Sequence, residues 1–301
     1  MPNDGNGTPP AAAATRDDAT LRARFEAVMA LPRHHADPHR ERGIDGLARL
    51  LAKAGCAPVH RHRFEAHDPW RDRPTTGTNL WCRTRPSAPR RFLLATHFDP
   101  PPAAHADPDP SRRDQPVPGA NDGASGVVAI LTILDGLRDT PDLGLDVVLF
   151  DGEELGTPDG VGYLAGSRAL AADLDAVAPH LRRIDGGVVL DMVARLGTTI
   201  RRDPLSERAA LPLVDHLFDT AMRFGTPCLR NEAGPAVLDD HAPLIEVGLP
   251  VVLLIDRDDP NWHTTADTMS AVSIASLACV ADLVAEALKT APSLRGRAQP
   301  M

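Results

Sequence analysis

Apolar residues recur at helical spacing in two segments near the start of the chain, residues 21–31 and 44–51. Shorter and denser apolar runs, typical of buried strands, follow them. From residue 123 onward the two patterns alternate, which predicts βαβ units. The expected strands are residues 59–64, 78–82, 92–96, 145–150, 187–190 and 250–255, and the further helices are residues 123–137, 161–174, 211–224, 239–247 and 270–288.

Together these elements predict an α/β fold with a mixed, mostly parallel central β-sheet flanked by helices, in a single domain over residues 19–290. Residues 1–18 are polar and rich in alanine, and we expect them and residues 291–301 to be disordered tails. Proline and aspartate are frequent in residues 99–118, which predicts a long irregular loop of the kind that often borders a site. Ser270 is the expected N-cap of the last helix.

Charge and cysteine content narrow the class of protein. The formal net charge is -9 and basic runs are scarce, so no nucleic-acid partner is expected, because phosphate binding needs clustered cations. The four cysteines are widely spaced and lack a CxxC pair, so reduced thiols are expected rather than a disulfide framework. No apolar stretch is long enough for a signal peptide or a membrane span, so we expect a cytoplasmic protein without a membrane partner.

Imidazole and carboxylate groups gather where the predicted strands end, and ligands of open α/β sheets bind beyond the carboxyl ends of the strands. Taken singly, each group has a structural explanation as a helix cap, a turn residue or a loop histidine. Their joint placement predicts a site, and two imidazoles with three carboxylates fit zinc. The groups at the strand ends are two imidazoles and five carboxylates, of which three would bind metal: His97 and Asp99, Asp122 at the mouth of a helix, the pair Glu153 and Glu154, Asp191, and His263.

Seven blocks in one order carry a more specific resemblance: Thr-His-Phe-Asp at 96–99, residues 118–126, Phe-Asp-Gly-Glu-Glu at 150–154, residues 166–168 and 190–192, Asp-Asp-His-Ala-Pro at 239–243, and Trp-His-Thr at 262–264. The chain resembles the zinc aminopeptidase superfamily and, within it, the animal-type glutaminyl-peptide cyclotransferases. The resemblance implies that Asp122, Glu154 and His263 bind zinc and that Glu153 is the general base and acid.

The number of metal ions stays open on this reading. Aminopeptidases of the superfamily hold a second zinc through residues that match His97, Asp122 and Asp191 here. The cyclotransferases keep these residues too, yet resemble one-metal enzymes. We therefore expect one zinc ion per chain, while the ligand set allows two.

Two residues favour the cyclotransferase branch. Asp239 stands where the peptidases more often have serine, and the resemblance implies that it hydrogen-bonds to Asp191, since two close carboxylates do not both ionise cheaply. Trp262 matches an aromatic that lines the substrate pocket. The structural alternatives are a helix N-cap for Asp239 and a packing aromatic for Trp262. Against the branch, residues 155–162 and 256–260 lack the expected aromatics, and Leu238 replaces a glutamine.

The predicted reaction is attack of an α-amine on a side-chain carbonyl, such as that of an N-terminal glutamine, to give pyroglutamate and ammonia. In it Glu153, Asp191 and Asp239 are the catalytic residues. The alternative is a zinc aminopeptidase that hydrolyses N-terminal peptide bonds, and a third reading is a binding relative without catalysis. We expect a peptide or small-molecule substrate with a free amino group.

Overall fold

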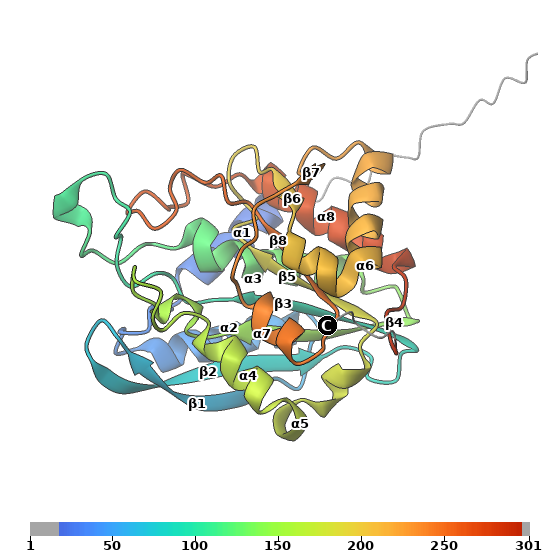
Figure 1. Ribbon diagram of the computed structural model, residues 1–301, viewed down its shortest axis with the longest axis horizontal. Helices are drawn as coiled ribbons and strands as arrows, with labels where there is room; N and C mark the ends of the chain where they lie inside the picture. Colours follow the sequence, from blue (N-terminus) through green and yellow to red (C-terminus); the bar gives the residue numbers. More distant parts are fainter. Residues whose placement is uncertain (1–17, 297–301) are drawn as a thin grey trace, which may run out of the picture.

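A computed structural model describes residues 18–296, and its centre is a six-stranded sheet (Figure 1). The strands are β1 (His60–Asp68), β2 (Arg73–Arg83), β3 (Arg90–His97), β4 (Leu143–Phe150), β5 (Gly186–Asp191) and β8 (Val251–Ile255). Their order is β1-β2-β4-β3-β5-β8. β3 pairs in parallel with β4 and β5, and β5 with β8, whereas β1–β2 and β2–β4 are antiparallel. The predicted mixed, mostly parallel sheet is confirmed.

The two faces of the sheet are covered by different helices. Neighbouring residues on a strand point to opposite faces, so each face packs against its own set of helices. The helices are α1 (Asp18–Met29), α2 (Arg40–Lys53), α3 (Ser125–Gly136), α4 (Ala165–Ala172), α5 (Leu174–Val177), α6 (Pro204–Phe224), α7 (His241–Glu246) and α8 (Ile274–Thr290). Phe92 and Leu94 of β3 share a core with α1, α2, α3, α6 and α8, whereas Leu93 and Ala95 share one with α4, α5 and α7. No helix between residues 18 and 296 has both the length and the apolar character that a membrane span requires.

The segment between β5 and β8 differs from the prediction. The helix expected at residues 211–224 begins at Pro204, where the N-cap Asp203 accepts a hydrogen bond from the Ser206 N–H at 2.7 Å. The sequence did not predict its first turns, because the helix is interrupted at Ala210. The nearby Pro212 has no backbone N–H with which to donate a hydrogen bond to the preceding turn. A separate two-stranded sheet, β6 (Ile200–Arg202) with β7 (Leu229–Ala233), is too short and polar to show a period.

Two expectations near the C-terminus are corrected. The N-cap of α8 is Ser273, which accepts from the Ser276 N–H at 3.2 Å, so Ser270 does not cap it. The expected tails lie mostly outside the described residues, but residues 291–296 pack on the domain. Leu294 is buried, and its N–H donates to the Asp185 carbonyl oxygen at 2.7 Å.

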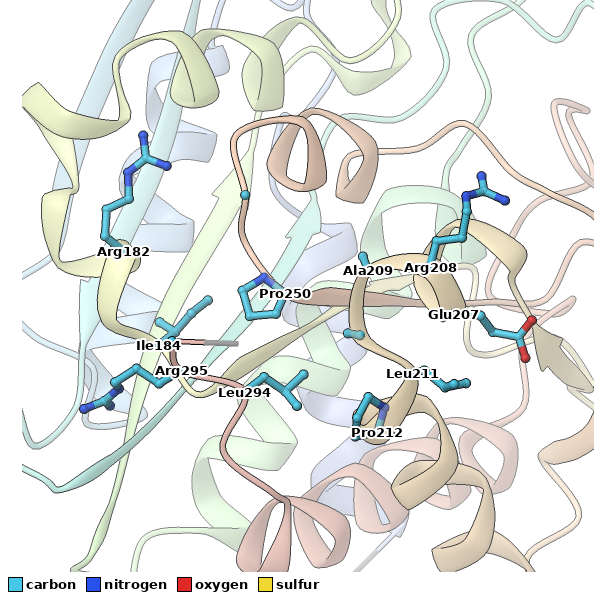
Figure 2. A pocket seen from close by; sticks show the side chains of 13 residues that line it. Arg182, Ile184, Glu207, Arg208, Ala209, Leu211, Pro212, Pro250, Leu294 and Arg295 are labelled. Carbon is cyan, nitrogen blue, oxygen red and sulfur yellow. The ribbon is translucent and has the colours of Figure 1, made fainter. Parts of the chain in front are cut away.

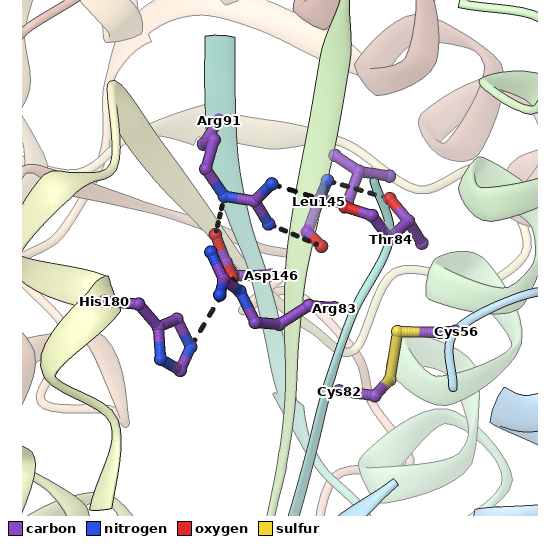
Figure 3. Close-up of a disulfide and its surroundings, with 8 residues drawn as sticks. All are labelled: Cys56, Cys82, Arg83, Thr84, Arg91, Leu145, Asp146 and His180. Atoms are coloured by element: carbon purple, nitrogen blue, oxygen red, sulfur yellow. Dashed lines mark hydrogen bonds and ion pairs between the residues drawn. A yellow bond between two sulfur atoms is a disulfide. The ribbon is translucent and has the colours of Figure 1, made fainter. Parts of the chain in front are cut away.

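The expectation of reduced thiols is wrong. Cys56 is disulfide-bonded to Cys82, beside a buried ion-pair network (Figure 3), and Cys228 is bonded to Cys279. The Cα–Cα distances are 5.6 and 6.2 Å, within the usual range for a disulfide. The partners are 26 and 51 residues apart in sequence, so the fold brings them together and their spacing gave no signal.

Candidate metal centre

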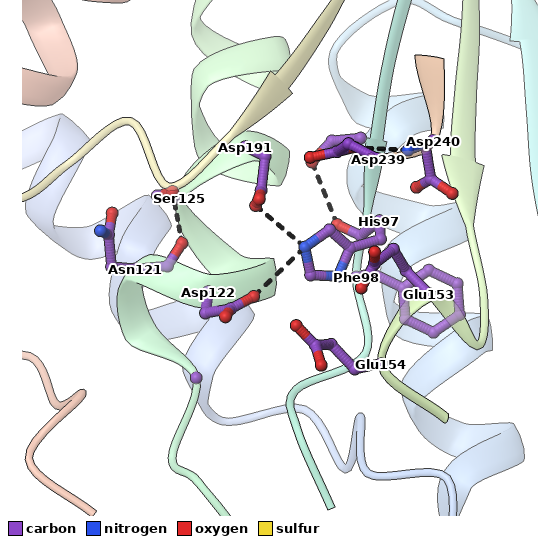
Figure 4. Close-up of polar contacts among 12 residues, drawn as sticks. His97, Phe98, Asn121, Asp122, Ser125, Glu153, Glu154, Asp191, Asp239 and Asp240 are labelled. Carbon is purple, nitrogen blue, oxygen red and sulfur yellow. Dashed lines mark hydrogen bonds and ion pairs between the residues drawn. The ribbon is translucent and has the colours of Figure 1, made fainter. Parts of the chain in front are cut away.

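The predicted ligands come from separate segments that meet at the carboxyl edge of the sheet (Figure 4). His97 is the last residue of β3, and Asp191 is the last residue of β5. Glu154 lies in a short turn directly after β4, and His263 lies in the loop after β8. Asp122 lies just before α3. The parallel strands therefore bring all five side chains to one end of the domain, as expected for an open α/β sheet.

Asp122 is held outside the following helix by the backbone around it. Its φ of -88° and ψ of 98° are not helical, and Gly123 has φ 99°, a region that residues with a Cβ rarely adopt. A Cβ at Gly123 would also lie 2.8 Å from the Asp99 carbonyl oxygen. The N–H groups of Asn121 and Asp122 donate to the two carboxylate oxygens of Asp267 at 2.7 and 3.0 Å. The side chain of Asp122 is left to face the other ligands and does not cap α3.

Asp122, Glu154 and His263 form the first ligand group. Their candidate ligand atoms all lie within 4.8 Å of one another, and all three side chains are buried. The His263 Nε2 atom is 2.9 Å from Glu154 Oε1 and 3.4 Å from Asp122 Oδ2. The three residues that the resemblance implies as zinc ligands are thus brought together.

This group has the properties of a metal site. Neither carboxylate oxygen of Asp122 nor Oε2 of Glu154 makes a hydrogen bond with any residue in the described part of the chain. Burial of a carboxylate without partners is costly, and a cation would offset the cost. One imidazole and two carboxylates also match a catalytic zinc site, which takes three protein ligands and leaves one position open. The donor set therefore fits zinc.

His97, Asp122 and Asp191 form a second ligand group that shares Asp122 with the first. The His97 Nε2 atom is 2.9 Å from Asp191 Oδ1 and 3.3 Å from Asp122 Oδ1. The other ring nitrogen of His97, Nδ1, lies 3.0 Å from the Asp99 carbonyl oxygen, to which it donates. That bond directs Nε2 toward the carboxylates, as is usual for a metal-binding histidine.

The pKa values of the histidines reflect the density of carboxylates around them. Burial acts to lower the pKa of His263, but the charge of Glu154 and the contacts with Asp122 and Glu154 raise it to about 10. For His97, burial also acts to lower the pKa, but the charge of Asp191 and the contacts with Asp122 and Asp191 raise it well above its usual value. Positive charge is therefore strongly stabilised at this edge of the sheet.

Glu153 and Glu154 are oriented by Asp99, which the sequence placed in the site without a specific role. The N–H groups of Glu153 and Glu154 donate to the two carboxylate oxygens of Asp99 at 3.2 and 3.1 Å. Glu153 belongs to neither ligand group, and its side chain lines the cavity above them. Burial, followed by the charge of Glu154, raises its pKa well above the usual value for a glutamate.

Asp239 lies beside Asp191 and Glu153 at the same cavity (Figure 4). Burial and then the charge of Asp191 raise its pKa to about 7. The implied hydrogen bond between Asp191 and Asp239 is not present among the contacts of the described residues, and Asp191 Oδ1 contacts His97 instead. The N-cap position of α7 belongs to Asp240, so helix capping does not account for Asp239.

The cavity above the metal centre has a volume of about 520 Å³. Trp262 lines it and stacks on His263, with ring centroids 3.9 Å apart and an interplanar angle of 25°. The same ring packs against the smaller of the two hydrophobic cores, so Trp262 both lines the cavity and contributes to packing. His105 enters the cavity from the loop 99–118, which borders the site as predicted, and Tyr163 supplies an aromatic that the sequence analysis missed.

A second cavity of about 370 Å³ lies near the amino ends of β5 and β8, away from the metal centre (Figure 2). Arg182, Arg208 and Arg295 are among the residues that line it. It contains none of the predicted ligands. The predicted ligands thus all lie at the carboxyl edge of the sheet.

Comparison with known proteins agrees with this geometry. The model of peptidase family M28 matches residues 79–288. A glutaminyl-peptide cyclotransferase of Bos taurus is 30% identical over 225 residues, covering 63% of this chain and 59% of the bovine protein. The chain therefore spans less than two thirds of the length of this relative.

Solved structures of similar fold include both kinds of enzyme considered above. A Zn-dependent exopeptidase from Parabacteroides distasonis has a TM-score of 0.83 at 27% identity and covers 91% of this chain and 98% of its own. Glutaminyl cyclases from Tannerella forsythia and Fimbriiglobus ruber have TM-scores of 0.82 and 0.83, each at 28% identity. They cover 92% and 94% of this chain and 99% of their own.

Proposed function

Since the chain belongs to peptidase family M28, we propose that it is a zinc-dependent glutaminyl cyclase that converts an N-terminal glutamine to pyroglutamate and releases ammonia. The observation that carries this proposal is the position of Asp239, which lines the cavity with Glu153 and Asp191 and does not cap a helix. The similarity to glutaminyl cyclases supports the proposal.

Asp122, Glu154 and His263 would hold the zinc ion, because their unpartnered carboxylate oxygens and single imidazole fit it. Bound there, zinc supplies Lewis acidity that polarises the substrate carbonyl. Glu153 is adjacent to the proposed ligand Glu154 and belongs to neither candidate ligand group. Its carboxylate is therefore available for proton transfer at the cavity.

In the proposed reaction, Glu153 accepts a proton from the α-amine of the substrate. The amine nitrogen bonds to the side-chain amide carbon, the bond from that carbon to the amide nitrogen breaks, and Glu153 returns its proton to the departing nitrogen, which leaves as ammonia. Asp191 and Asp239 hold that nitrogen. Both reacting groups belong to one residue, so the cavity mainly has to hold a reactive conformation.

A second candidate is a zinc aminopeptidase, and one observation favours it. The group of His97, Asp122 and Asp191 has the composition and closeness of a second metal site. Two bound ions and a Glu153 that takes a proton from water would suit hydrolysis of the first peptide bond. A binding relative without catalysis is disfavoured, because the ligands and Glu153 are all in place.

Incubation of the zinc-loaded protein with a glutaminyl peptide separates these functions. Cyclisation releases ammonia and leaves the number of residues unchanged, whereas hydrolysis releases a free amino acid. We expect ammonia, and a Glu153→Gln variant that keeps its zinc should lose about 10²- to 10⁴-fold in kcat. Release of amino acid alone would reject the cyclase in favour of the peptidase.

We also infer that the protein works in an oxidising compartment. The two disulfides support this, since such bonds are rare where thiol reductants act. The expectation of a cytoplasmic protein came from the lack of an apolar stretch long enough for a signal peptide or a membrane span. Yield of folded protein should be higher in an oxidising than in a reducing expression host, and equal yields would count against the inference.

A further inference from the structure

The cavity above the metal centre carries opposite charges at different depths. The buried part is lined by four carboxylates, those of Glu153, Glu154, Asp191 and Asp239. Two exposed arginines, Arg168 and Arg257, line the same cavity. The buried carboxylates are accounted for by metal binding and proton transfer, whereas the arginines have no part in either.

Arg257 is available to a ligand. Its guanidinium makes no ion pair or hydrogen bond with any residue from 18 to 296, although it lies in an acidic segment. The three aspartates beside it are occupied by other donors at 2.7 Å: Asp256 by Arg195, Asp258 by Arg201, and Asp259 by the side-chain amide of Asn121. A positive charge is thus kept free in a segment where intramolecular pairing would otherwise be expected.

The position of Arg257 relative to the metal centre is fixed by stacking. The Trp262 ring stacks on the ligand His263 at 3.9 Å, and the Arg257 guanidinium carbon lies 4.8 Å from the Trp262 ring centroid. This contact restricts the guanidinium without neutralising it. An extended peptide advances about 3.3–3.6 Å per residue, and Arg257 lines the same cavity as the candidate ligands, so the residue after an N-terminal glutamine would lie within that cavity.

Building on the proposed function, we propose that Arg257 is a specificity-determining residue that binds a carboxylate on the residue after the N-terminal glutamine. The preferred substrates are then glutaminyl peptides with aspartate or glutamate in second place. Such a substrate matches the cavity at both ends, because its amine meets the buried carboxylates and its acidic group meets the arginine. Arg168 adds positive charge to the same opening.

The expected preference is modest, because the pair forms in contact with solvent. An exposed pair of this kind changes kcat/KM by about 2- to 5-fold, and salt screens it. The carboxylate could be the side chain of the second residue or the terminal carboxylate of a dipeptide. Both groups are carboxylates, so the experiment distinguishes them by comparing substrates that carry only one of the two.

The test compares kcat/KM of the zinc-loaded protein for Gln-Glu-Ala-amide and Gln-Gln-Ala-amide. We expect a preference of about 2- to 5-fold for the first peptide, which Arg257→Gln abolishes and Arg257→Lys largely keeps. Arg208→Gln is the matched control, because Arg208 is also exposed and lines the other cavity. A parallel comparison of Gln-Ala with Gln-Ala-amide shows whether a terminal carboxylate is recognised equally well.

An unchanged preference in Arg257→Gln, or an equal loss in Arg208→Gln, would overturn the proposal. Salt provides a readout without mutation, since 1 M NaCl should reduce the preference of the unmodified protein. If the peptides are hydrolysed, the cyclase is rejected and the preference is measured on the released amino acid. If neither reacts, calorimetric binding of Nva-Glu-Ala-amide and Nva-Gln-Ala-amide, whose norvaline (Nva) cannot cyclise, decides whether Arg257 selects the acid.

Discussion

Removal of the Cys228–Cys279 disulfide should destabilise the protein by up to about 4 kcal/mol. A cross-link stabilises mainly by restricting the unfolded chain, and the effect grows with the length of the closed loop. For the 51-residue separation of this pair the relation gives about 4.1 kcal/mol, and for the 26 residues between Cys56 and Cys82 it gives about 3.5 kcal/mol. The longer loop should therefore contribute more.

The assay is thermal and urea unfolding of the double variant Cys228→Ala with Cys279→Ala, followed by circular dichroism. At about 2 °C per kcal/mol for a chain of this size, Tm should fall by about 8 °C. The variant with both Cys56 and Cys82 changed to alanine serves as the comparison, with a slightly smaller fall. The reasoning is refuted if four thiols titrate in the denatured, unreduced protein, or if reduction leaves Tm unchanged.

Three further changes test the site and its supports. Asp122→Ala should abolish zinc binding, because both ligand groups use this residue, whereas Asp191→Asn should keep one ion per chain, as counted by elemental analysis. Gly126→Ala should cost about 3 kcal/mol in urea unfolding, since its Cβ would lie 2.6 Å from the Leu190 carbonyl oxygen. Burial acts to raise the pKa of Asp151, but Arg40 of α2 and His35 lower it below the usual value for an aspartate. The stability that the ionised Asp151 carboxylate provides is therefore lost in acid. The difference in Tm between wild type and Asp151→Asn should therefore be largest at pH 6 and should disappear below about pH 4. A difference that does not depend on pH would contradict this reasoning.

The buried parallel strands could be predicted from the sequence because each is a short, dense apolar run. Residues 92–96 and 145–150 lie wholly within β3 and β4. The small sheet of β6 and β7 could not be predicted, since Arg201, Arg202 and Arg230 leave it no apolar period. The disulfides were missed for a related reason. The closeness of Cys228 and Cys279 depends on the packing of distant elements, and no local pattern reports it.

Within the site, the sequence identified the side chains that strand ends present, because parallel strands necessarily bring their carboxyl ends to one edge. It did not predict how these side chains are oriented, although it placed Asp99 in the site. Asp99 and Asp267 act through hydrogen bonds to backbone N–H groups of neighbouring turns, and such contacts depend on loop conformations that motifs do not encode. The clustering of the candidate ligands could thus be predicted, whereas the contacts that support them required the structure.

The same distinction separates the reaction from its specificity. The positions of the candidate ligands depend on the sheet, and structures of similar fold include both an exopeptidase and glutaminyl cyclases. Choice of substrate depends on loops, and here the loop after β8 presents Arg257 in a segment where the resemblance led us to expect an aromatic. A charged group at that position favours an ionic substrate over an apolar one. The departure from the pattern that first weakened the cyclase reading is therefore the feature that makes the identity of the substrate testable.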